Sequence, residues 1–288
     1  MKMESKKRFR KIVSLMLAAI MMVSVFSVSV PQTAEAATPS LKGSGSSSVK
    51  ITDSNCYGMT KKANYIKFKS NVTGYVTLKF SNNSRIMNAW GHVTFCNSKK
   101  KALGVREFFN TASSNSAIKM RTYGVKKGTT YMIKVESEGG VKVSASVVSV
   151  KKSAGASRGK AKSLGKNKTV KGVMIAGSKA GDWYKIKLTK KQKLHISYSV
   201  KTNGLTQNGY CTGGIKFTLY KSNGTKFTND FDYANLATPK NGSIYCLRNR
   251  YTGAETGLNP GTYYIKVEPH RASSSYKTSS GYYTLKWK

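Results

Sequence analysis

The side chains that could act as acids, bases or nucleophile partners are few and scattered. The 288-residue chain contains 11 Asp and Glu residues and three histidines. A hydrolase needs a nucleophile with a positioned base, or two carboxylates a few ångströms apart. His92 and His195 have no acidic residue close to them in sequence, and His270 falls in a predicted loop. We therefore expect exposed histidines and a protein that is not an enzyme.

One pair of carboxylates lies close together, in the segment Asp230-Phe231-Asp232. Calcium takes six to eight oxygen ligands. Two aspartates with Glu255 as a third ligand fall short of that number unless backbone carbonyls complete the set. This segment predicts a polar turn, with no metal site and no cofactor.

Lysine is the charged residue that the chain uses in a pattern. The formal net charge is +39, whereas solubility is served by a modest net charge. On two segments an aromatic residue and two lysines alternate with apolar residues, so each set shares one strand face. We predict that these faces bind a polyanion, the alternative being that the lysines only keep a β-protein soluble. The candidate binding residues are Tyr65, Lys67, Lys69, Trp183, Lys185 and Lys187.

The apolar residues recur with a period of two, which is typical of half-buried strands. Residues 261–268 and 128–136 are two copies of one such strand, each preceded by a turn signal. Three further strand signals recur in the same order, so the chain is predicted to hold two copies of one module. The predicted fold class is all-β, with two tandem jelly-roll-like antiparallel β-sandwich domains. The inward residues expected in the second copy are Tyr184, Ile186, Leu188, Leu194, Ile196, Tyr198, Phe217, Leu219, Tyr263, Ile265, Val267, Tyr283, Leu285 and Trp287.

The first 36 residues have the features of a cleaved secretory signal peptide. A basic start is followed by an apolar run over 12–30 and by the small-x-small site Ala34-Glu35-Ala36. A retained anchor is the alternative, because the run is nearly long enough to span a membrane. The predicted organisation is signal peptide 1–36, flexible leader 37–48, module 49–150, basic linker 151–168 and module 169–288. The mature chain would keep 44 basic and nine acidic residues, a net charge of +35.

Each predicted module contains two of the four cysteines. Exported proteins commonly form disulfides. We therefore predict two bridges within the modules, Cys56 to Cys96 and Cys211 to Cys246.

Four motifs resemble the bacterial pre-peptidase C-terminal domain family. They are Asp182-Trp183-Tyr184-x-Ile186-x-Leu188, Leu219-Tyr220-x-Ser222-Asn223-Gly224, Pro260-Gly261-Thr262-Tyr263-Tyr264-Ile265-x-Val267 and Gly281-Tyr282-Tyr283-Thr284-Leu285. The resemblance covers residues 155–288 well and 49–150 more loosely. It implies a jelly-roll-like sandwich that accompanies secreted peptidases or binds matrix or polysaccharide. The chain differs from the family pattern because no catalytic domain precedes the motifs and the calcium-binding acidic cluster is missing.

These observations favour a secreted, non-catalytic protein, released or held non-covalently at a bacterial cell surface. Its predicted partner is an anionic cell-wall polymer or acidic polysaccharide. Two alternatives remain. One is an accessory module that binds carbohydrate or matrix through Trp183 and Tyr65, with a secreted peptidase as a further candidate partner. The other is an enzyme of unrecognised type. No motif for reading nucleic acid is present in the sequence, and no membrane anchor is expected after processing.

Overall fold

A computed structural model describes residues 38–51, 63–83, 88–114, 116–203, 206–207, 210–211, 214–227, 241–245, 252–270 and 279–288. The signal peptide predicted for 1–36 lies outside these residues and stays a prediction. Among the described residues, no helix is long and apolar enough to cross a membrane. The helix α2 (Ser116–Lys119) spans a single turn.

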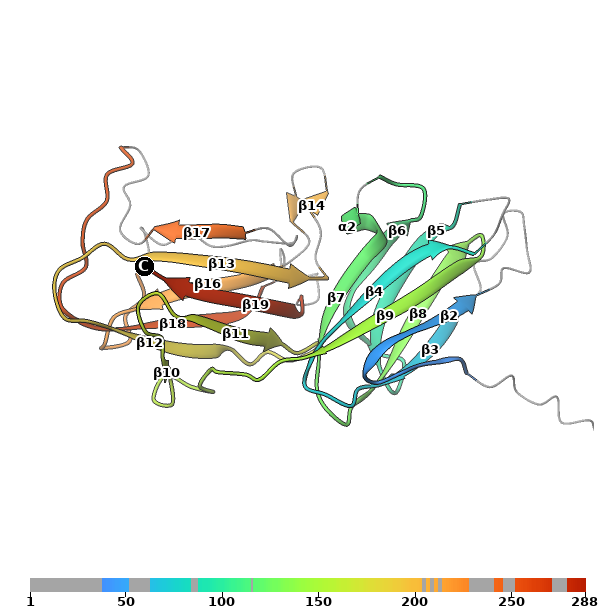
Figure 1. The fold of residues 1–288 in the computed structure, drawn as a ribbon, viewed down its shortest axis with the longest axis horizontal. Helices are drawn as coiled ribbons and strands as arrows, with labels where there is room; N and C mark the ends of the chain where they lie inside the picture. The colour runs from blue at the N-terminus through green and yellow to red at the C-terminus, as the bar shows by residue number, and fades with distance from the viewer. Residues whose placement is uncertain are drawn as a thin grey trace, which may run out of the picture. The chain divides into compact units, whose positions relative to one another are not determined.

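The N-terminal sheets form a β-sandwich, here called the first sandwich (Figure 1). One sheet has the order β1 (Ser40–Leu41), β3 (Asn64–Lys69), β8 (Thr130–Glu138), β5 (Trp90–Asn97) and β6 (Ala102–Asn110). The other has the order β2 (Gly45–Ile51), β9 (Val141–Ser149), β4 (Gly74–Asn82) and β7 (Met120–Val125). Both sheets contribute buried residues to one core, among them Phe68, Ile133, Leu78 and Val143.

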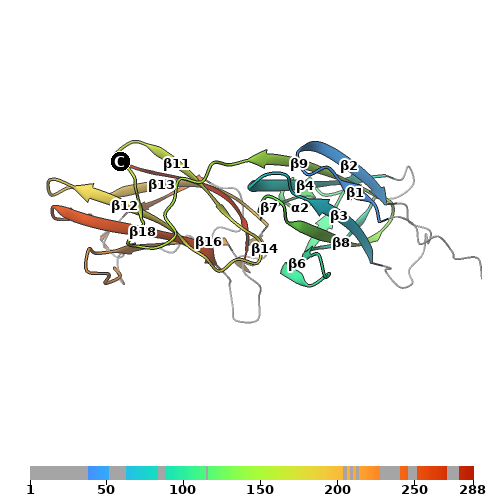
Figure 2. The same ribbon diagram turned by 90° about the horizontal axis from the view of Figure 1, so that it is seen from below.

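The C-terminal sheets form the second sandwich (Figures 1 and 2). One sheet has the order β10 (Lys162–Ser163), β12 (Asp182–Leu188), β18 (Gly261–His270) and β16 (Gly214–Tyr220). The other has the order β11 (Thr169–Met174), β19 (Gly281–Trp287), β13 (His195–Thr202) and β17 (Asn241–Tyr245). A separate pair joins β14 (Thr206–Gln207) and β15 (Tyr210–Cys211). The second core includes Tyr184, Ile186, Phe217 and Leu285.

The predicted all-β sandwich class is confirmed, and the period of two explains why. Along β12 buried residues alternate with exposed or half-buried ones, and along β19 they alternate with half-buried ones. Of the predicted inward residues, all are buried except Tyr198, which packs half-buried against the second core. Strand pairing is antiparallel apart from two short parallel pairs, β1 with β3 and β10 with β12.

Two segments differ from the predicted organisation. The leader predicted as flexible over 37–48 forms β1 and most of β2, and Leu41 is buried in the first core. The predicted linker over 151–168 contains β10, and Leu164 is buried in the second core. The leader is rich in Ser and Gly, the linker is rich in Lys, Ser and Gly, and neither shows apolar alternation. Backbone pairing with an existing strand, rather than periodicity, therefore makes them regular. The domain bounds as such stay a prediction.

A chain of buried polar groups crosses the second core. The Tyr283 hydroxyl donates to Asp182 Oδ2 at 2.7 Å and lies 2.9 Å from the Tyr184 hydroxyl. Lys152 forms an ion pair with the same carboxylate. Burial raises the pKa of Asp182 and raises the pKa of Tyr184 to about 12. The neighbouring strand residue is Gly172, where an added Cβ would lie 2.2 Å from the Tyr283 ring.

Replacing Tyr283 with Phe is expected to lower the free energy of unfolding by about 1–3 kcal/mol, because the buried Asp182 carboxylate loses a donor. Chemical denaturation of wild type and variant measures this difference. Tyr282→Phe is the matched control. Tyr282 is half-buried and its ring centre lies 4.9 Å from that of Tyr75. Loss of its hydroxyl leaves this ring contact in place, so that change should be close to neutral. Equal losses in the two variants would contradict the role given to the Tyr283 hydroxyl.

Candidate functional site

The lysines predicted to face outward from β12 do so. Lys185 and Lys187 are exposed, while Tyr184, Ile186 and Leu188 between and beside them are buried. The apolar side of β12 is held in the second core, so both lysines extend from a strand packed against the core rather than from a loop.

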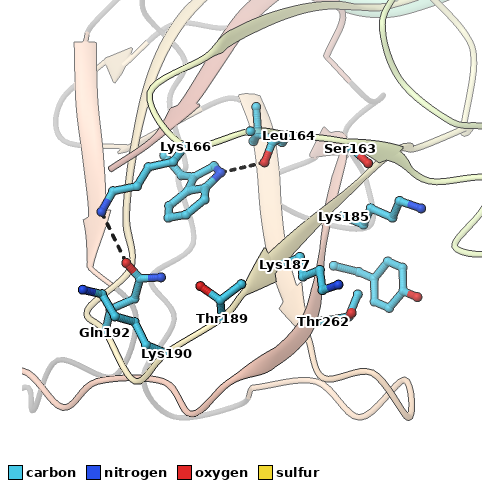
Figure 3. Close-up of a pocket in the computed structure, with 12 residues that line it drawn as sticks. Ser163, Leu164, Lys166, Lys185, Lys187, Thr189, Lys190, Gln192 and Thr262 are labelled. Atoms are coloured by element: carbon cyan, nitrogen blue, oxygen red, sulfur yellow. Dashed lines mark hydrogen bonds between the residues drawn. The ribbon is translucent and has the colours of Figure 1, made fainter.

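These two lysines lie in a groove of about 650 Å³ on the second sandwich (Figure 3). Five parts of the chain line it: the segment from β10 to residue 166, β12, the turn that follows β12, β18, and the last residue of β19. The lining residues are Ser163, Leu164, Gly165, Lys166, Lys185, Lys187, Thr189, Lys190, Gln192, Thr262, Tyr264 and Trp287. We call this the lysine groove.

The lysine groove is cationic throughout. Four of its lining residues are lysines and none is acidic. Within the described ranges, no ion pair involves Lys166, Lys185, Lys187 or Lys190. Like charges that share a concave surface raise the local potential and attract anions. The four ammonium groups are therefore available to a negatively charged ligand.

One wall of the groove is fixed by hydrogen bonds to its neighbours. Leu164 N donates to Lys185 O at 2.9 Å, which continues the parallel pairing of β10 with β12. The Trp287 indole Nε1 donates to Leu164 O at 2.7 Å. A turn follows, in which Asn167 has a φ of 60° and donates its N–H to Trp287 O at 2.9 Å. This turn holds Lys166 beside the groove.

Lys166 has two neutral neighbours there. Its Nζ lies 3.3 Å from Gln192 Oε1 and 5.8 Å from the centre of the Trp287 ring. Figure 3 shows Lys166 reaching toward Gln192 at the end of the groove, beyond Thr189 and Lys190. Neither neighbour neutralises the ammonium charge.

Trp183 lies outside the lysine groove, although it precedes Lys185 on the same strand face. Its ring centre is 5.1 Å from that of Tyr220, and Lys266 Nζ lies 5.9 Å from it. The ring is half-buried. Contact with these neighbours reduces the ring area that could stack on a sugar.

The corresponding residues of the first sandwich are arranged differently. Lys67 and Lys69 are exposed on β3, as predicted. Tyr65 is half-buried, and Lys100 Nζ lies 4.6 Å from the centre of its ring. Of the six predicted binding residues, Lys185 and Lys187 line the lysine groove. That the two strand faces bind a ligand stays a prediction.

Four residues of the groove are not among the predicted binding residues: Lys166, Lys190, Tyr264 and Trp287. Lys166 falls in the predicted linker, and Trp287 is predicted only as a core residue. Period-two patterning shows which way a strand residue faces, but it does not show which distant strand lies beside it.

The predicted bridge between Cys56 and Cys96 is absent, because Cys96 is a free, buried thiol. Its Sγ lies 3.6 Å from Thr94 O, and burial raises the pKa of the thiol. Cys96 is enclosed by its strand partners, Ala102 on β6 and Met132 on β8, which counting cysteines per module does not reveal. Cys56 and Cys246 lie outside the described residues, so the bridge from Cys211 to Cys246 stays a prediction.

His195 has an acidic neighbour, Glu255, that is 60 residues away in the sequence. Its Nε2 lies 2.8 Å from Glu255 Oε2, and Lys193 Nζ lies 3.7 Å from the same oxygen. A histidine beside a carboxylate is not by itself a catalytic site, because the chemistry also needs a group that reacts with a substrate. Asp230 and Asp232 lie outside the described residues. In the ranges that are described, no three His, Cys, Asp or Glu residues gather as metal ligands.

Neither a family model nor a curated protein matches the chain. Among solved structures, the pre-peptidase C-terminal domain of a collagenase from Bacillus anthracis is 23% identical, with a TM-score of 0.26, over 44% of this chain and 93% of that one. PNGase F, a glycosylasparaginase from Flavobacterium meningosepticum, is 10% identical over 84% of this chain and 94% of that one, with a TM-score of 0.27. The CUB1-EGF-CUB2 region of human MASP-1/3 is 7% identical over 85% and 100%, with a TM-score of 0.25. At these TM-scores the similarities carry no argument about function.

Proposed function

We propose that the protein is a non-catalytic binding protein that holds an anionic polymer of the cell surface or extracellular space in the lysine groove. The observation that carries this proposal is the convergence of four lysines, without an acidic residue, in one groove of about 650 Å³. The net charge of +39 adds a long-range attraction for polyanions. A polymer fits this site better than a single anion, because the lysines are distributed along the groove rather than around one point (Figure 3).

The carbohydrate alternative depends on Tyr65 and Trp183, and both rings are half-buried beside lysine ammonium groups. We therefore rank it below the polyanion. A peptidase or matrix partner remains a separate hypothesis that arises only from the resemblance in sequence.

The double variant Lys185→Glu, Lys187→Glu is expected to bind a teichoic acid at least about tenfold more weakly than wild type, because two attractive charges become repulsive. The measurement is a binding titration over a series of salt concentrations. Wild-type affinity should fall steeply with salt, and the variant should show a shallower dependence.

Lys160→Glu with Lys171→Glu is the matched control. Both residues are exposed, both lie outside the lysine groove, and the change in net charge is the same. The control should keep most of the affinity. An equal loss in the two double variants would mean that net charge alone drives binding, and unchanged affinity in the groove variant would leave its lysines as solubility residues.

A further inference from the structure

Three lysines follow one another along one side of the groove. Lys185 and Lys187 are exposed on β12, and Lys190 is in the turn beyond it. Residues two apart on a strand project from the same face about 6.8 Å apart. Figure 3 shows Lys185 and Lys187 on β12 and Thr189 just past its end, in this order, with Lys166 and Gln192 beyond them. A bound chain that follows β12 therefore meets two positive charges one strand step apart, at Lys185 and Lys187, and a third at Lys190 in the turn that follows.

The cationic residues of the groove indicate which anionic group a ligand would carry. All four charged lining residues are lysines and none is arginine. The planar fork of arginine pairs with a carboxylate through two parallel hydrogen bonds, whereas a lysine ammonium is a compact point charge with three donors. A row of ammonium groups does not depend on the plane of a carboxylate and is suited to the oxygens of tetrahedral phosphates.

The step between the lysines favours phosphates joined by a short polyol. In a glycerol phosphate chain six bonds separate successive phosphorus atoms, and the extended length of this unit is close to the two-residue step of a strand. In a 1,4-linked uronic acid chain with two-fold symmetry, successive carboxylates point to opposite sides. Carboxylates on the same side are then two sugar rings apart, which exceeds the step from Lys185 to Lys187.

The neutral lining residues suit the linker between the phosphates. Thr189, Thr262 and Tyr264 bring hydroxyl groups to the same groove as the lysines. Each hydroxyl can both donate and accept a hydrogen bond. Polyol hydroxyl groups offer the matching partners, so phosphates and linkers would both find complementary groups.

We infer that the lysine groove selects a polyol phosphate chain, with successive phosphates on Lys185 and Lys187. The inference rests on the proposed function, because it names the polymer class that the same groove prefers. It adds that the groove distinguishes among anionic polymers by the spacing of their charged groups and by whether these groups are phosphates or carboxylates.

The test compares an oligomer of glycerol phosphate with an oligogalacturonate of the same number of charges, titrated against the full chain at one moderate salt concentration. Wild type is expected to bind the phosphate oligomer at least about tenfold more tightly.

A charge-conserving variant, Lys187→Thr with Thr189→Lys, moves the second lysine from β12 to the residue just past its end and so widens the spacing of the first two lysines. It should bind the phosphate oligomer about fivefold more weakly, since one ion pair is lost, and the galacturonate as before.

Three different results would each overturn a different claim: selection of polyol phosphates, the spacing argument, or the proposed function. Equal affinity of wild type for the two oligomers, when both are weakened by Lys185→Glu with Lys187→Glu, keeps the proposed function and overturns selection of polyol phosphates. A charge-conserving variant that binds the phosphate oligomer like wild type overturns the spacing argument. Binding of both oligomers that the groove variant does not weaken overturns the proposed function itself. Thermal unfolding of each variant verifies that the fold is kept.

Discussion

Replacing Glu107 with Ala is expected to lower the free energy of unfolding by about 3–5 kcal/mol, the cost of leaving a buried charge without its partner. Glu107 on β6 and Arg121 on β7 are both buried, and Arg121 Nε lies 3.6 Å from Glu107 Oε2. The Tyr123 hydroxyl also donates to this carboxylate, and Asn203 Nδ2 donates to Glu107 Oε1 at 2.5 Å. Removing the carboxylate thus affects three buried donors at once.

Denaturant unfolding monitored by aromatic fluorescence measures the loss. Glu138→Ala on β8 is a useful comparison, because Glu138 is a half-buried carboxylate outside this cluster and its removal should cost well under half as much. The double variant Glu107→Leu, Arg121→Met removes both charges together and should recover a large part of the stability. If Glu107→Ala unfolds like wild type, the cluster does not stabilise the first sandwich.

The second large effect is a dependence of stability on pH. Burial raises the pKa of Glu107 from 4.5 to about 7, while Arg121 and the hydrogen bonds from Tyr123 and Asn203 oppose the rise. The folded state therefore binds a proton that the unfolded state releases near pH 4.5. The contribution of Glu107 is fully present below about pH 4.5 and is lost as the pH rises through about 7. It amounts to about 3 kcal/mol at 1.36 kcal/mol for each pKa unit.

Glu107→Gln isolates this contribution, because the amide cannot titrate. The difference in unfolding free energy between wild type and Glu107→Gln should fall by about 3 kcal/mol from pH 4.5 to pH 8. Other carboxylates, including Asp182, are common to both proteins and cancel in the difference. A difference that does not change over this range would mean that Glu107 has an ordinary pKa in the folded protein.

The sequence predicted the strand faces well because the period of two is a local property. Tyr184, Ile186 and Leu188 had to face one way once β12 formed, and Lys185 and Lys187 the other. The sandwich class followed, since such strands with short turns bury their apolar faces against another sheet.

The contacts between distant segments could not be predicted in the same way. Lys166 reaches the groove because β10, only two residues long, pairs in parallel with β12. Glu255 reaches His195 across 60 residues of sequence. The cluster around Glu107 depends on Asn203, which is 96 residues away. Each is set by the order of the strands in the sheets and by the course of the connecting segments, which apolar alternation along a single strand does not encode.

Strand β1 is parallel to its neighbour β3, and β10 is parallel to its neighbour β12. The positions of β1 and β10 matter when many copies of the protein bind close together on one polymer. Each is the edge strand next to a lysine-bearing strand: β1 pairs with Lys67 and Phe68 on β3, and β10 with Tyr184 and Lys185 on β12. Copies bound side by side on one polymer would be held at high local concentration, where open strand edges join and form aggregates. At these positions the edge hydrogen bonds are already made within the chain, so a polymer could be densely coated without the copies fusing through β3 or β12.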